Sequence, residues 1–161
     1  MKTLLITGIG GLTPRSIATV IREKYPHYHV IGIDIDKKAM GFFMYTKGRK
    51  LVDEYYVCPR CDSPDYFPFI EKLVADKHID YAFVQPEAEI VVWGDYYEKH
   101  GKHPVTTFMG CKLLSESLRD KAIMASLLEG TDFIPKTIKV TQKEPKFHEV
   151  EHELNNMQFK T

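Results

Sequence analysis

Three glycines, Gly8, Gly10 and Gly11, follow the short apolar run TLLIT near the start of the chain. Glycine lets the backbone turn tightly and approach a phosphate closely, and the amino end of a following helix favours anions. Asp34 stands about 20 residues beyond this turn, the spacing of an acid that binds ribose hydroxyls in nucleotide-binding folds. The four residues together predict a contact with a phosphate or another ligand.

This fingerprint is incomplete, because Thr13 or Pro14, depending on the register, replaces the third glycine of G-x-G-x-x-G. Proline has no N–H to offer a phosphate. None of the nine tyrosines has a lysine four positions later, so the Tyr-x-x-x-Lys pair of short-chain dehydrogenases and epimerases is absent. A structural alternative therefore stays open for each feature. For the glycines, it is that the turn only reverses a strand into a helix. For Asp34 and Asp36, it is that they cap a helix over residues 37–44.

Two further motifs resemble metal sites. Residues 148–152, HEVEH, fit the H-E-x-x-H pattern of zinc proteases, but their flanks are polar and only nine residues follow. Cys58 and Cys61 have the spacing of half a zinc ribbon, yet no second C-x-x-C completes the four ligands. We therefore expect a solvated helical face and a loop, and no metal site.

Composition excludes several classes of function. The 22 basic and 22 acidic residues cancel, so no net field attracts nucleic acid or an anionic membrane. No apolar stretch is long enough to form a signal peptide or to cross a bilayer. Three cysteines are too few and odd in number for a disulfide framework, which favours a reducing compartment and a cytoplasmic protein.

Strand and helix patterns alternate along the chain. Short apolar runs predict five strands, at residues 3–7, 29–34, 55–57, 81–84 and 105–108. Helical spacing predicts a first helix with Thr13 as its cap and a second helix that starts at residue 63. It also predicts helices over residues 89–100 and 113–128. This alternation predicts an α/β fold, a Rossmann-like open parallel sheet of about five strands with helices on both faces. We expect one domain over 1–140 and a linker, or the start of another domain, over 141–161.

The segment Leu118–Thr137, LRDKAIMASLLEGTDFIPKT, resembles the end of the amino-terminal domain of ATP-grasp enzymes. In that family a D-K pair opens a helix and a loop closes with an "iP.T" pattern, here Asp120-Lys121 and residues 134–137. The segments TLLITGIGG, VIGIDID, DEYYVCP and QPE occur upstream in the order seen in members similar to the carbamoyl-phosphate synthase large subunit. The resemblance covers about residues 1 to 140.

The resemblance implies that Lys121 contacts the phosphates of ATP, a role that suits its compact charge. The alternative is an exposed lysine in the first turn of a helix. Glu87 and Glu89 follow the fourth predicted strand, where such folds bind ligands, and could orient a substrate amine or a partner domain. They could equally stabilise the start of the next helix.

The family's ligases phosphorylate a carboxylate with ATP and let an amine displace the phosphate, with ATP and magnesium bound by a later lobe. No such lobe is recognisable here, so we expect this chain to be the amino-terminal domain of such a ligase, inactive alone, with no catalytic residue and no cofactor of its own. Its partners would be an ATP-grasp domain, in cis or on a separate chain, and a small-molecule substrate. The chain would be a fragment, a truncated product or one half of a split protein.

Two other hypotheses remain. One is an NAD(P)-binding, oxidoreductase-like Rossmann domain, in which Asp34 would bind the ribose. The other is a non-catalytic module that associates with itself as a homo-oligomer, or with a partner, through a face left uncovered.

Overall fold

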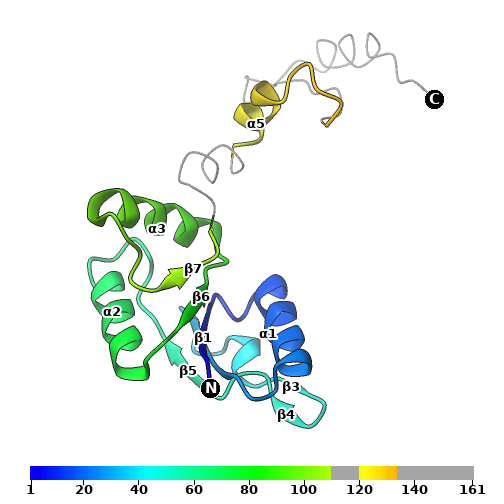
Figure 1. Ribbon diagram of the computed structural model, residues 1–161, viewed down its shortest axis with the longest axis vertical. Coiled ribbons are helices and arrows are strands. Elements are labelled where there is room, and N and C mark those ends of the chain that lie inside the picture. The colour runs from blue at the N-terminus through cyan, green and yellow to red at the C-terminus, as the bar shows by residue number, and fades with distance from the viewer. Residues whose placement is uncertain (110–119, 134–161) are drawn as a thin grey trace, which may run out of the picture. The chain divides into compact units, whose positions relative to one another are not determined.

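The computed structural model describes residues 1–109 and 120–133. The chain divides into two compact units, Met1–Ser115 and Glu116–Thr161, and each is described here by itself. The domain boundary that we predict after residue 140 lies outside the described residues. The described part of the first unit contains the sheet and three α-helices (Figure 1).

Five parallel strands form the sheet, in the order β5-β2-β1-β6-β7. Leu5 of the central strand is paired with Ile31 on one side and with Ala82 on the other. The sequence predicts all five strands, and the Rossmann-like α/β fold is confirmed. The strands are β1 (Thr3–Thr7), β2 (His29–Asp34), β5 (Glu54–Val57), β6 (Tyr81–Phe83) and β7 (Thr106–Thr107).

Helices cover both faces of the sheet (Figure 1). Helices α2 (Tyr66–Lys77) and α3 (Glu87–His100) pack on one face, where Leu5 and Trp93 belong to the same buried cluster. Helix α1 (Leu12–Lys24) covers the opposite face, where Ile6 and Ala18 share a second cluster. Successive residues of a strand point to opposite faces, so β1 contributes to both cores.

The helix ends correct several predicted boundaries. Gly11 is the cap residue of α1, so the prediction of Thr13 as the cap is wrong by two positions. Pro14 still lies in the first turn, where its missing N–H is no loss. Helix α2 begins three residues later than predicted, after Asp65, and α3 begins two residues earlier, at Glu87.

A helix over residues 37–44 does not form. The structure has only a 3₁₀ turn, η1 (Met40–Phe42), followed by a hairpin that the sequence analysis missed, β3 (Tyr45–Thr46) and β4 (Arg49–Lys50). The backbone of Gly41 lies so close to Ile9 that a Cβ there would overlap the Ile9 carbonyl group. This close approach belongs to the tertiary fold and leaves no trace in the local helical pattern.

The described part of the second unit is short. It contains α5 (Lys121–Leu127), which begins where the resemblance places the start of a helix, after Asp120. Residues 113–119 of the helix predicted over 113–128 lie outside the described residues. In the part of the chain that the structure describes, no helix has the length and apolar character needed to cross a membrane.

Candidate functional site

The order of the strands places a switch point between β1 and β6. The chain runs from β1 outward through β2 to β5, and then crosses back to β6 and β7 on the other side of β1. The loops after β1 and β6 therefore leave the sheet in opposite directions at its carboxyl edge. Open α/β sheets bind their ligands at such a point, so we take this edge as the candidate site.

The glycine turn after β1 is closed by its own neighbours. Gly8 has a positive φ of 60°, a conformation that a side chain rarely adopts, and its carbonyl accepts a hydrogen bond from the N–H of Gly11 at 2.8 Å. A Cβ on Gly8 would lie 2.5 Å from Cγ of Pro86. Gly8 is thus required by the turn itself and by the proline that packs over it from the loop after β6.

Asp34 binds the glycine turn directly. The N–H of Gly10 donates to Oδ2 of Asp34 at 2.8 Å, and the N–H of Asp36 donates to Oδ1 at 3.0 Å. The structure thus brings together the glycines and the acid that the sequence analysis singles out. Each carboxylate oxygen keeps a further lone pair, so Asp34 can still accept a hydrogen bond from a ligand hydroxyl.

The space next to Gly10 is also occupied. A Cβ at Gly10 would lie 2.9 Å from Oδ2 of Asp34 and 3.2 Å from Cβ of Ala39. Because the Gly10 N–H already donates to Asp34, it is not available to a phosphate in this conformation. The contact between the turn and a phosphate stays a prediction.

The amino end of α1 carries positive charge. Unpaired N–H groups at a helix start favour anions. Arg15 lies in this turn, where its Nε donates to the carbonyl of Gly11 at 3.0 Å and its guanidinium contacts the sulfur of Met40 at 2.7 Å. Leu12 and Thr13, the first two residues of the helix, are exposed.

The two glutamates of α3 have different surroundings. Glu87 is exposed, whereas Glu89 is only 5% exposed and accepts a hydrogen bond from the Tyr66 hydroxyl at 2.7 Å. Burial raises the pKa of Glu89, and hydrogen bonds from Tyr66 and Thr7 partly oppose this effect. Both glutamates lie in the first turn of α3, where acidic side chains stabilise a helix.

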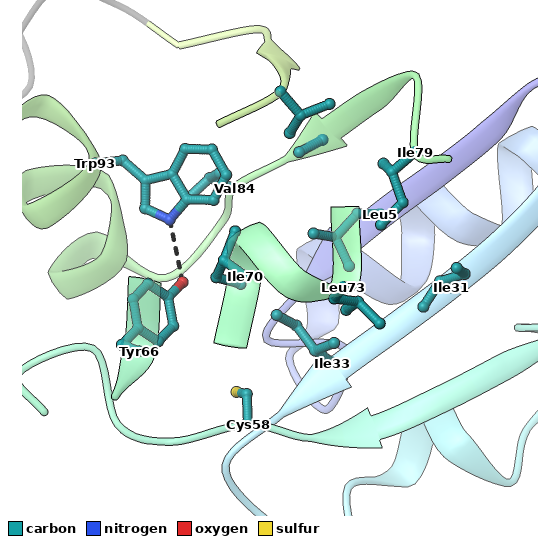
Figure 2. Close-up of a cluster of buried hydrophobic side chains, with 12 residues drawn as sticks. Leu5, Ile31, Ile33, Cys58, Tyr66, Ile70, Leu73, Ile79, Val84 and Trp93 are labelled. Carbon is teal, nitrogen blue, oxygen red and sulfur yellow. Dashed lines mark hydrogen bonds between the residues drawn. The ribbon is translucent and has the colours of Figure 1, made fainter. Parts of the chain in front are cut away.

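Tyr66 and Trp93 are the residues of this region that the sequence analysis missed. The indole N–H of Trp93 donates to the Tyr66 hydroxyl at 3.1 Å (Figure 2). Trp93 has no exposed surface and lies in the same buried cluster as Leu5 of the central strand. A tyrosine at the start of one helix and a tryptophan in the next give no local signal of their hydrogen bond, because 27 residues separate them.

Cys58 and Cys61 lie beside this network as free thiols. Cys58 directly follows β5 and is buried in the same cluster as Tyr66 and Trp93 (Figure 2). Burial raises the pKa of the Cys58 thiol to about 12, and the charge of Glu89 adds to this effect. Such a thiol is a poor nucleophile and a poor metal ligand at neutral pH.

Lys121 is the first residue of α5. The carboxylate of Asp120 caps this helix by accepting hydrogen bonds from the N–H of Ala122 at 2.9 Å and of Ile123 at 3.2 Å. A capped first turn fixes the backbone from which the lysine side chain extends. The role of Lys121 in binding ATP stays a prediction.

Metal ligands do not gather in the described residues. No group of three or more histidine, cysteine, aspartate or glutamate side chains within residues 1–109 and 120–133 could hold a metal ion. The HEVEH motif at 148–152, the third cysteine, Cys111, and the "iP.T" residues 134–137 lie outside these ranges.

No protein-family model and no curated protein matches the sequence. Among solved structures, dTDP-glucose 4,6-dehydratase from Bacillus anthracis in complex with NAD is similar at 12% identity and a TM-score of 0.46, covering 62% of this chain and 34% of that chain. NAD⁺-bound xylitol dehydrogenase is similar at 26% identity and a TM-score of 0.36, covering 51% of this chain and 32% of that one. The chain thus spans about a third of either protein, and its own sheet order, more than these likenesses, defines the fold.

Proposed function

We propose that this chain is the amino-terminal domain of an ATP-dependent ligase that joins a carboxylate to an amine through an acyl phosphate. The observation that carries the proposal is the start of α5, where Asp120 caps a helix that opens with Lys121. In the resemblance described above, this D-K pair opens a helix whose lysine reaches the ATP phosphates. Lys121 would supply a point charge to the phosphates, and the remaining chemistry would come from an ATP-binding lobe in cis or on another chain.

The glycine turn supports this assignment indirectly. Its Gly10 N–H is bonded to Asp34, and Pro86 and Ala39 lie against its glycines. A turn closed in this way holds the strand and helix together and leaves Gly10 no N–H for a dinucleotide phosphate. We therefore assign the turn a structural role and place the phosphate contact on Lys121.

In this proposal, magnesium binding and the transfer steps belong to the ATP-binding lobe. An ATP-dependent ligase neutralises the phosphate charges with magnesium held by carboxylate ligands. The described residues contain no cluster of three such ligands, so they do not fit a resident magnesium site.

A second candidate function is that of an NAD(P)-binding, oxidoreductase-like domain. One specific observation favours it: Asp34 lies at the carboxyl end of β2, beside the glycine turn, with lone pairs that could accept ribose hydroxyls. Neither of the two similar solved structures is an ATP-dependent ligase, and both hold NAD. NAD is therefore the dinucleotide to test.

Titration calorimetry of the whole chain with NAD and NADP separates the two candidates. The ligase proposal predicts no binding heat at micromolar concentrations. The second candidate predicts micromolar binding that weakens at least about tenfold in Asp34→Asn. The single amide oxygen can still accept the Gly10 N–H, but the second carboxylate oxygen, which could accept a ribose hydroxyl, is replaced by an NH₂ donor. Asp36→Asn, which changes an exposed acid two residues away, is the matched control.

The ligase proposal has its own test in the gene. We expect an ATP-binding lobe to be encoded beyond codon 161 or in an adjacent reading frame, and negligible ATP turnover by the 161-residue chain alone. In the protein that carries this lobe, Lys121→Ala should lower kcat/KM for ATP by about 10- to 100-fold, whereas Lys37→Ala should not. Robust turnover by this chain alone, or the absence of any such lobe, would overturn the proposal.

A further inference from the structure

Four polar groups form a buried relay across the switch point. The indole N–H of Trp93 donates to the Tyr66 hydroxyl at 3.1 Å, and this hydroxyl donates to Oε2 of Glu89 at 2.7 Å (Figure 2 draws the first bond). The Thr7 hydroxyl also bonds Glu89, and it accepts the backbone N–H of Gln85 at 3.1 Å. The relay therefore joins α2, α3, the end of β1 and the loop after β6.

The direction of these bonds is fixed at both ends. An indole N–H and a backbone N–H can only donate, so the hydroxyls of Tyr66 and Thr7 act as acceptors toward Trp93 and Gln85. Each hydroxyl then has its own proton free for Glu89. The carboxylate of Glu89 receives both protons, an arrangement that suits its ionised form and that a protonated carboxyl would disturb.

Within residues 1–109 and 120–133, no cation is paired with this carboxylate. Among the described residues, the titratable groups that face it are Tyr66 of α2, Cys58 and Cys61 of the loop after β5, and Asp34 at the end of β2, and none of these side chains is basic. A buried carboxylate without a positive partner is costly, and an apolar residue at this position would stabilise the core more.

We infer that Glu89 is a positioning residue: its carboxylate, held between the Thr7 and Tyr66 hydroxyls, fixes the Gln85–Pro86 loop against the glycine turn. Thr7 holds the N–H of Gln85, the next residue is Pro86, and Pro86 packs against Gly8. Gly8 in turn accepts the N–H of Gly11, the cap residue of α1. The relay thus sets the shape of the candidate site, whichever nucleotide or substrate binds there.

Trp93 is the only tryptophan of the chain, so its fluorescence reports on the relay. When the pH of the wild-type chain is varied, we expect a step in Trp93 emission. Its midpoint should lie above pH 4.5, the ordinary pKa of a glutamate, because burial favours the protonated form of Glu89. Glu89→Gln should lose this step. Glu87→Gln, which changes the exposed acid on the same helical turn, should keep it.

His103 requires a control, because its ring centroid lies 5.8 Å from that of Trp93. Its pKa is lowered from 6.5 by burial, so its titration could also alter the emission. The titrations are therefore repeated in a His103→Gln background, where the Glu89 step should persist. If Glu89→Gln does not fold, Tyr66→Phe, which removes one hydroxyl from the relay, should lose or shift the step instead.

Hydrogen exchange tests the positioning itself. Thr7→Val keeps the shape of the side chain but removes the hydroxyl, and it should speed exchange of the Gln85 N–H by about five- to tenfold, the effect of one lost hydrogen bond. Thr7→Ser should restore the wild-type rate. The inference is overturned if the emission step survives in Glu89→Gln, or if Thr7→Val leaves the Gln85 N–H as protected as in the wild type.

Discussion

At the scale of single residues, Gly8 has a specific structural role in the turn after β1. Gly8 combines a φ of 60° with a Cβ position only 2.5 Å from Cγ of Pro86, whereas Gly48 has a φ of 77° and nothing within 4 Å. A side chain would strain the backbone at both positions, but only at Gly8 would it also overlap a neighbouring residue. The pair separates the cost of the backbone conformation from the cost of the contact.

Gly48→Ala should lower the free energy of unfolding by about 1–2 kcal/mol, the cost of placing an ordinary residue in the left-handed region. Gly8→Ala should lower it by a further 1–3 kcal/mol or so, because the new methyl group overlaps Pro86. Denaturant unfolding monitored by Trp93 fluorescence measures both. Equal losses in the two variants would show that Pro86 does not constrain the turn.

Single residues also show what a sequence can predict about a site. The pairing of Asp34 with the glycine turn follows from spacing alone, because a strand of known length carries the acid to the same edge of the sheet. The burial of Glu89 does not follow, since its partners Thr7 and Tyr66 are distant in sequence. Side chains that meet only through the tertiary fold are invisible to local patterns.

At the scale of elements, a group of charges ties β5 to its neighbours. Glu54 of β5 pairs with Lys77 of α2 at 2.7 Å and with His29 of β2 at 2.9 Å. The hydrogen bond from Lys77, then that from Tyr56, lowers the pKa of Glu54 to about 2. A four-residue strand at the edge of the sheet is thereby tied both to its neighbouring strand and to a helix.

The lowered pKa of Glu54 predicts a pH dependence of stability. Because the folded pKa lies below the ordinary value of 4.5, the stabilising effect is fully present above pH 4.5 and is lost as the pH falls toward 2. Glu54→Gln should therefore be less stable than the wild type at pH 7, by up to about 1 kcal/mol for a partly exposed group. The difference between the unfolding curves of the two proteins should shrink from pH 7 to pH 4 and again to pH 2.5, and a difference that is still of full size at pH 2.5 would contradict this account.

Elements also differ in how well the sequence predicts them. The strands β1 and β2 match their predicted bounds, because a buried parallel strand is a continuous apolar run with a sharp polar end. The predicted helix over 37–44 fails, because Gly41 must pack against the backbone of Ile9 and the chain can form only the 3₁₀ turn. The hairpin β3–β4 is missed because its two-residue strands are too short to show a period.

At the scale of the first unit, one sheet separates two buried clusters. Leu5 and Trp93 lie in the cluster under α2 and α3, and Ile6 lies in the cluster under α1. Neither Leu5 nor Ile6 has any exposed surface, although they are neighbours in β1. If the two clusters depend on the same strand, neither can be lost without the other.

This dependence predicts one cooperative transition for the described part of the first unit. Ile6→Ala should lower the free energy of unfolding by about 2–5 kcal/mol, the usual cost of such a cavity, and Leu5→Ala by a similar amount. Trp93 belongs only to the cluster of Leu5, so its fluorescence should respond to Ile6→Ala only if the sheet couples the two faces. We expect the Trp93 transition of both variants to move to lower denaturant with the same slope as the wild type. A Trp93 transition left in place by Ile6→Ala would mean that the face under α1 unfolds separately, and that the glycine turn, which leads into α1, can open while the relay around Glu89 stays intact.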